Sequence, residues 1–292
     1  MAITVNTNIP SLTAQKSLNN ATSKMNTAME RMTTGLKINS SKDDAAGMAV
    51  ANKLDYKISS LDVAQNNGQM GASMLDTAEG VLNVINDNLV RIRDLTEQAA
   101  NGTYGTDAMT AIETEVQARM DEITRLAESS EFNGKILFNP NDKTANGIRD
   151  DITLQVGIKS DETSQIKLSA DLFKSAQASV LFNGAANVTG GDFSAVFDSD
   201  ANARTFLTAI DEALADVTSR TTLLGGYQQR IISAMDAAGV METNLTSAKS
   251  LIEDADIAEE SSNYVKQQIL QQTSASLLAT ANQAPSIALN LV

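Results

Sequence analysis

The sequence predicts a mainly α fold, an elongated rod of long coiled-coil helices formed by paired N- and C-terminal segments, with a small β-rich middle region. Apolar residues recur at seven-residue steps in both halves of the chain, which is the pattern of a coiled-coil seam. Aromatic residues make up only 4% of the 292 residues, so there is little bulk for a rounded core. The few prolines leave long stretches free to form helices, since they stand only at Pro10, Pro140 and Pro285.

The longest repeat lies in the C-terminal half. Seven heptads predict one helix of roughly 70–80 Å, at about 1.5 Å per residue. A second, less regular series of small or apolar residues, including Ala213, Tyr227 and Ala234, lies three positions behind the first. The first series is Ile210, Val217, Leu224, Ile231, Ala238, Leu245 and Ile252.

The N-terminal half carries a matching seam. A helix with Leu18, Met25 and Met32 at heptad spacing is expected to stop near Gly35, and in the following loop Ser41 and Asp44 form a candidate helix cap. The main seam comes next, and "NGTYGT" from position 101 ends its helix. A shorter helix follows, with apolar residues at positions 109, 112, 116, 123 and 126. The main seam consists of Leu75, Ala78, Leu82, Ile85, Leu89, Ile92 and Ala99.

The middle of the chain has a different pattern. "EFNGKILFNPND" places an Asn-Gly turn between short apolar runs, which predicts a hairpin. "DITLQVGIKS" and "SQIKLSA" alternate apolar and polar residues as strands do. The next stretch, "LFNGAANVTGGDFSAVFDSDANA", is rich in Gly, Asn and Asp, and we expect loops or a small β insertion there.

Composition excludes several classes of function. The chain has no cysteine and no histidine, so it lacks thiol chemistry and the commonest general base and metal ligand. The carboxylates of "IEDADIAEE" lack the glycine and ligand order of a calcium loop. We therefore expect no enzyme activity, no cofactor and no metal. A net charge of −14 argues against nucleic acid, and without an apolar run of eighteen residues we expect no membrane insertion.

Charge is unevenly spread along the chain. Residues 1–40 carry four basic residues and only one acid, whereas residues 251–266 carry five acids and one lysine. The two segments are complementary, although two solvated helix faces would explain the pattern equally well. From Gln267 to Val292 the chain has no charged residue at all.

Four motifs carry a family resemblance. The N-terminal stretch "MAITVNTNIPSLTAQKSLNNATSKMNTAMERMTTGLKINSSKDDAAGMAVANKL", "LVRIRDLTEQAANGTYG", "EFNGKILF" and the closing "ANQAPSIALNLV" follow one another in order. Together they resemble bacterial flagellin, the filament subunit of the bacterial flagellum, over roughly residues 1–170 and 204–292. Residues 174–203 depart from the resemblance.

The resemblance implies a layered organisation. Residues 1–42 and 254–292 would form the N- and C-terminal halves of an inner coiled-coil core. Residues 43–173, with β-hairpins, and residues 204–253 would form the two halves of an outer helical core. Residues 174–203 would form a short, variable, outward-facing region. Family members leave the cell unfolded through the flagellar type III export channel, which implies an extracellular filament protein without a cleaved signal peptide.

The uncharged tail then has a physical explanation. Its apolar side chains are too few to fold alone and would be buried against copies of the chain and its N-terminal segment. Absence of charge avoids stacking like charges at every repeat of a polymer. We expect both termini to be largely disordered in the monomer and helical after assembly. The candidate assembly residues are Leu277, Leu278, Ile287, Leu289 and Leu291.

The resemblance also implies partners. These are copies of the chain, the filament cap protein, the hook–filament junction proteins, and an export chaperone on residues 250–292. "LVRIRDLTEQAANGT" is the family stretch read by animal Toll-like receptor 5, and the matching residues are Arg91, Leu95 and Glu115. An arginine and a carboxylate flanking an exposed leucine would suit a binding hot spot.

Three alternative functions are a hook–filament junction protein, an enzyme inserted in the outward region and a membrane-active coiled coil. A hook–filament junction protein would share the terminal coiled coil but be present in few copies. An enzyme inserted in the outward region is disfavoured, because about thirty residues without histidine cannot hold a zinc-protease motif. A membrane-active coiled coil would need a long apolar hairpin, which the sequence lacks.

Overall fold

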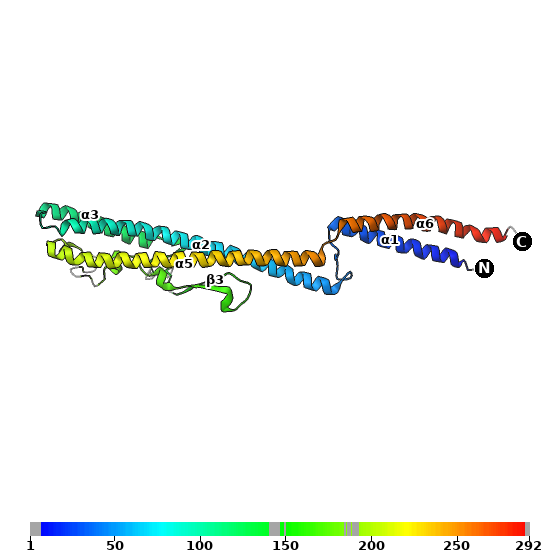
Figure 1. The fold of residues 1–292 in the computed structure, drawn as a ribbon, viewed down its shortest axis with the longest axis horizontal. Helices are drawn as coiled ribbons and strands as arrows, with labels where there is room; N and C mark the ends of the chain where they lie inside the picture. The colour runs from blue at the N-terminus through cyan, green and yellow to red at the C-terminus, as the bar shows by residue number, and fades with distance from the viewer. Residues whose placement is uncertain are drawn as a thin grey trace. The chain divides into compact units, whose positions relative to one another are not determined.

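The computed structural model describes residues 7–139, 147–148, 150–183, 185, 188 and 193–289, with side chains up to residue 283. The described chain is mainly helical, with long helices and a small strand-containing middle region, as predicted (Figure 1). It divides into two compact units, residues 1–58 with 243–292 and residues 59–242. We call them the terminal unit and the central unit. Their boundaries fall after residues 58 and 242. The expected division into inner and outer cores, after residues 42 and 253, stays a prediction.

The terminal unit contains two helices that lie side by side, α1 (Ile9–Thr34) and α6 (Ile257–Leu289) (Figure 1). The side chain of Asn8 accepts the N–H of Ser11 and caps the start of α1. The helix ends where the sequence predicts, because Gly35 adopts a left-handed φ of 74° and its N–H bonds to the carbonyl of Arg31.

Helix α2 (Ala45–Ala99) begins after a loop with its own hydrogen bonds. The Oδ1 atom of Asp44 accepts the N–H groups of Ala46 and Gly47, both at 3.0 Å. The predicted cap therefore lies at Asp44 itself, three residues later than the expected Ser41, because a carboxylate two positions before an amide reaches it directly. The helix ends immediately before "NGTYGT", as predicted.

The central unit is built from α2 beyond residue 58, α3 (Thr106–Ser129) and α5 (Asp200–Glu253) as far as residue 242. Helices α2 and α5 are antiparallel. Arg93 pairs with Asp211 at 2.8 Å at one level, and Gln65 donates to Glu242 at 2.7 Å at another. Their predicted seams form the core of this unit. Fully buried seam residues are Leu75, Ala78, Leu82, Ile85, Leu89, Ile92, Ile210, Val217, Leu224 and Ile231.

Two small antiparallel sheets complete the predicted middle region. Strands β1 (Glu131–Phe132) and β2 (Lys135–Ile136) form the expected hairpin. Asn133 and Gly134 make its turn with φ of 49° and 80°, the left-handed values that an Asn-Gly turn supplies. Strands β3 (Ile152–Gln155) and β4 (Gln165–Leu168) pair with Ile152 opposite Leu168. Short 3₁₀ turns occupy Glu162–Ser164 (η1) and Ala170–Phe173 (η2).

The described part of residues 174–203 consists of loops, turns and short helical segments that pack against α5. That this region faces outward stays a prediction. The described segment forms the short helix α4 (Ala178–Leu181) and the turn η3 (Ser194–Val196). Phe182 and Phe193 are buried against Phe206 of α5, with ring centroids 5.1 and 5.8 Å from that of Phe206. The Gly- and Asn-rich composition concealed these aromatic anchors, because turn residues between them dominate the pattern.

A buried arginine fastens the start of this segment to α5. The Nη1 atom of Arg220 donates to the carbonyl oxygen of Lys174 at 2.9 Å, and Nη2 pairs with Asp216 one turn earlier. The side chain of Arg220 is only 8% exposed. Its Nε has no hydrogen-bond partner among the described residues.

Candidate functional site

The candidate assembly site is the pair formed by α1 and α6. Side chains on α1 that meet α6 are small: Ala14, Ala21 and Ala28 are the buried residues of that helix, at heptad spacing. The buried residues on the described part of α6 are polar, Glu260 and Ser274. Because alanine buries little surface, such a seam gains much less hydrophobic stabilisation than one of leucines.

Polar contacts also link the two antiparallel helices. Near the chain ends, Asn8 donates to the carbonyl of Ala281 at 2.7 Å and Ser11 donates to Asn282 at 2.7 Å. Further along, Gln271 donates to the hydroxyl of Thr22 at 3.0 Å.

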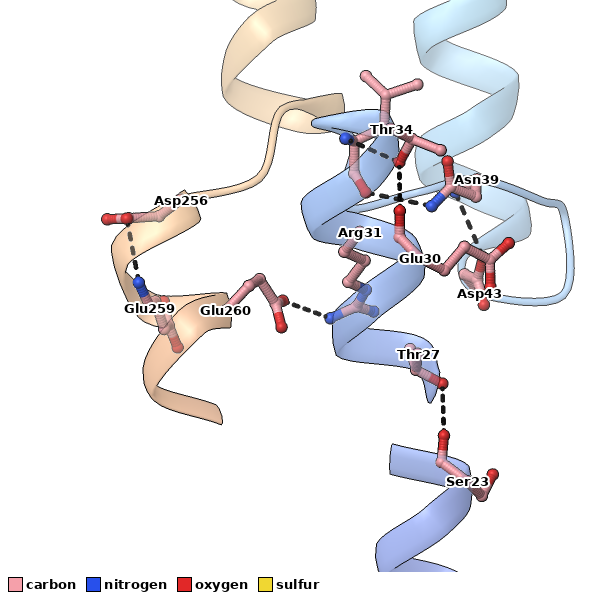
Figure 2. Close-up of polar contacts among 11 residues, drawn as sticks. Ser23, Thr27, Glu30, Arg31, Thr34, Asn39, Asp43, Asp256, Glu259 and Glu260 are labelled. Atoms are coloured by element: carbon pink, nitrogen blue, oxygen red, sulfur yellow. Dashed lines mark hydrogen bonds and ion pairs between the residues drawn. The ribbon is translucent and has the colours of Figure 1, made fainter. Parts of the chain in front are cut away.

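An ion pair closes the far end of the seam. Arg31 and Glu260 approach to 2.9 Å, and the Glu260 side chain is only 11% exposed (Figure 2). Asp256 caps α6 by accepting the N–H groups of Ala258 and Glu259. The predicted complementarity of the basic and acidic segments is confirmed at this pair.

The neighbouring loop is organised by a second carboxylate. Asp43 accepts the backbone N–H groups of Asn39 and Ser40 and the hydroxyl of Ser40 (Figure 2 shows the contact with Asn39). The hydroxyl of Ser40 is the main reason that the pKa of Asp43 lies below its ordinary value. The loop between α1 and α2 thus has a defined conformation.

The pair leaves large apolar side chains on its outer surface. Leu277, one of the predicted assembly residues, is 58% exposed, and Leu278 beside it is half-buried. The side chains of Ile287 and Leu289, and the whole of Leu291, lie outside the described residues. Other exposed large apolar residues on the two helices are Ile9, Leu12, Met29, Ile257, Val265, Ile269 and Leu270.

The single chain already has both terminal helices. Capping and ion-pair contacts support these helices. That the termini are largely disordered before assembly stays a prediction. In the single chain, the described apolar side chains on the outer face of the pair remain exposed.

The three predicted receptor residues lie together on the central unit, but not as expected. Arg91 on α2 donates to Glu115 on α3 at 2.9 Å, and both side chains are partly exposed. Leu95 is only 3% exposed, so the expected exposed leucine is wrong for this chain. It belongs to the hydrophobic core of the unit, because α2 contacts more than one neighbouring element at this level and therefore buries a wide face.

No cluster of three or more acidic, histidine or cysteine residues suited to a metal ion occurs among the described residues. None of the described helices combines the length and apolar character that crossing a membrane requires.

Long paired helices with an uncovered apolar face define a class of protein, the helical structural proteins. Within that class, the chain belongs to the bacterial flagellin family. Residues 5–143 match the model of the bacterial flagellin N-terminal helical region, and residues 207–292 match that of the C-terminal helical region.

Individual relatives agree with this assignment. The chain is 36% identical over 323 residues to a flagellin of Xenorhabdus nematophila, and 31% identical over 376 residues to polar flagellin F of Vibrio parahaemolyticus. Both alignments cover 100% of each chain. Among solved structures, a Vibrio parahaemolyticus protein assigned to the flagellar hook-associated proteins shares the fold. It has a TM-score of 0.59 and 19% identity, covering 72% of this chain and 99% of that one.

Proposed function

We propose that this chain polymerises into the helical filament of the bacterial flagellum for swimming motility. The observation that carries the proposal is the outer face of α6, where Leu277 and Ile269 are 58% and 57% exposed in the single chain. Both residues belong to the charge-free stretch from Gln267 to Val292. Copies of the chain that stack through it would bury these side chains without bringing like charges together. Contacts between different faces of successive copies give an open helical polymer.

The same proposal covers the route to the filament. The subunit would leave the cell unfolded through the flagellar type III export system, without a cleaved signal peptide, and reside outside the cell. A chain without cysteine forms no disulfide that would have to be reduced before unfolding. An export chaperone would cover residues 250–292, which include the exposed apolar face of α6, and the filament cap and hook–filament junction proteins would contact the assembled chain.

Recognition by Toll-like receptor 5 is a separate proposal, supported by the position of Arg91 and Glu115. Their ion pair is partly exposed and presents a guanidinium and a carboxylate side by side. Leu95, buried beneath, would support the pair rather than enter the receptor interface. A receptor reporter assay with Arg91→Ala tests this; activation equal to that of the unmodified protein would contradict it.

Seeded polymerisation tests the main proposal. Purified chain is added to short filament seeds and growth is followed by electron microscopy, with circular dichroism to record helix content. Full-length protein should elongate the seeds, and a truncation lacking Gln267–Val292 should remain monomeric. A full-length chain that stays monomeric, or forms short closed oligomers, would contradict the filament role and favour a hook–filament junction protein.

A matched pair of variants sharpens this experiment. Ile269→Ser with Leu277→Ser removes two exposed apolar side chains from α6 and should slow elongation by about tenfold or more, since buried apolar anchors dominate interfaces. Gln272→Ser changes an exposed polar residue on the same helix and should leave elongation unchanged. Monomer helicity should be the same in both, which separates a lost interface from a lost fold.

A further inference from the structure

The seam between α1 and α6 repeats every seven residues on both helices. On α1 the buried alanines are spaced in this way, and on α6 two interleaved heptad series are buried or half-buried. Sliding one helix by seven residues therefore again places the buried alanines of α1 opposite buried or half-buried positions of α6, with the loss of only one repeat. The seam alone leaves the register open, as in other regular coiled coils. The α6 series are Glu260, Gln267, Ser274 and Ala281, and Tyr264, Gln271 and Leu278.

A backbone contact beside the seam has no such repeat. The N–H of Lys37 donates to the carbonyl of Glu253 at 2.6 Å, and the N–H of Ala255 donates to the carbonyl of Gly35 at 2.9 Å. Leu36 and Asp254 thereby face each other in an antiparallel bridge. We call residues 35–37 and 253–255 the clasp. Residues seven positions further into α1 or α6 lie inside helices, where the backbone groups are already paired, so the clasp cannot re-form after a slip.

The ion pair next to the clasp also disfavours a slipped register. Glu260 lies in the seam and is almost completely buried, and Arg31 supplies its positive partner (Figure 2). A seven-residue slip would leave this carboxylate without its arginine. A buried charge that loses its partner is strongly destabilising.

We propose that the clasp, with the adjoining Arg31–Glu260 pair, selects the register of α1 against α6 and excludes the register slipped by seven residues. The alanines allow the two helices to approach closely, and the clasp determines which heptad of α1 faces which heptad of α6. The inference concerns the single chain and holds whether or not the chain polymerises.

The absence of cysteine from the chain permits a direct test by disulfide trapping. Thr22 and Gln271 are in contact at 3.0 Å, so Thr22→Cys with Gln271→Cys reports the observed register. Thr22→Cys with Tyr264→Cys, or with Leu278→Cys, reports the two registers slipped by seven. With the clasp intact, the yield of each slipped disulfide should be below about a tenth of the yield of the observed pair, because disulfides tolerate little error in distance.

Breaking the clasp should change this ratio. Lys37→Pro removes the N–H that bonds to Glu253 and puts a ring carbon against that carbonyl. Lys37→Ala keeps the N–H and serves as the matched control. Lys37→Pro should raise the slipped yields by at least about fivefold, as expected when a register-specifying contact is lost from a regular seam. Ala255→Pro, which removes the other donor, should act in the same direction.

Each other outcome overturns the proposal. Equal yields in Lys37→Pro and Lys37→Ala would show that the seam fixes its own register. Slipped disulfides in the unmodified clasp would show that the clasp does not exclude them. Loss of all three disulfides in both proline variants would show that pairing as such, rather than the choice of register, depends on these residues.

Discussion

The two units use opposite kinds of helix contact. In the central unit, α2, α3 and α5 meet through leucine, isoleucine and valine, and all seven phenylalanines of the chain lie between residues 132 and 206. In the terminal unit, α1 and α6 meet through alanines and polar pairs while large apolar side chains remain outside. The difference lies in what the helices enclose. The central unit encloses a large apolar core and still exposes side chains such as Val63, Met70 and Val240, whereas the α1–α6 pair encloses mainly alanine and polar groups and leaves its larger apolar side chains exposed.

The largest effect is expected from removing the buried aromatic ring of Phe206 in the central unit. Phe206→Ala should lower the free energy of unfolding by about 3–5 kcal/mol, because Phe206 is fully buried against Phe182 and Phe193. Urea denaturation followed by circular dichroism measures the loss. Tyr104→Ala, at a 44% exposed aromatic of the same unit, should change stability by less than about 0.5 kcal/mol. Equal effects would show that the phenylalanine cluster does not hold the unit together.

A smaller loss is expected at the buried arginine of the same unit. Arg220→Met should cost about 1–3 kcal/mol, because it leaves the carbonyl of Lys174 without its donor. The same urea experiment measures it. Arg125→Met breaks the exposed pair with Glu122 and should cost clearly less. A neutral or stabilising Arg220→Met would show that apolar packing serves this position equally well.

The terminal unit should respond to added bulk rather than to lost bulk. Ala21→Leu forces apart helices that approach through alanine, and should destabilise the α1–α6 pair by about 1–3 kcal/mol. Amide hydrogen exchange in α1 reports the change. Asn20→Leu adds the same bulk at an exposed neighbouring position and should have little effect. If both variants exchange at the same rate, the alanine seam is not a close contact.

The smallest effect concerns an ion pair at the edge of the terminal unit. Lys249 donates to Asp55 at 2.6 Å, and this hydrogen bond is the main reason that the pKa of Lys249 is raised. The stabilisation is complete below the ordinary lysine pKa of about 10.4 and is lost as the pH rises through the raised value. Between about pH 9.5 and 11.5, the melting temperature should therefore fall more steeply for the natural chain than for Asp55→Asn. Parallel curves would contradict this assignment.

Sequence periodicity located the helices well, because heptads record which face is buried. Ile210, Val217, Leu224 and Ile231 are all buried as predicted, and the hairpin turn at Asn133 and Gly134 followed from the special backbone values that these residues favour. Local rules of this kind need no knowledge of distant partners.

Sequence patterns did not reveal features that depend on tertiary contacts. The family resemblance suggested an exposed Leu95, and periodicity along α2 could not correct this because it does not show how many neighbours the helix has. Phe182 and Phe193 lie among turn residues, so no repeat revealed that they pack on α5. The contact between residues 36 and 254 joins positions far apart in sequence through backbone groups, on which side-chain patterns carry no information.

The pairing of α1 with α6 also fixes an order of events. Residues 9–34 are among the first to be made or delivered when the chain moves N-terminus first, and their partners at 257–289 are among the last. The core of residues 59–242 can close before those partners arrive. Until then the first helix has only its own hydrogen bonds, and an isolated helix of that length is marginal in water. Its pairing therefore waits for residues 257–289, and a molecule in which these residues have not yet been made or delivered is distinguishable at this seam from one in which they have.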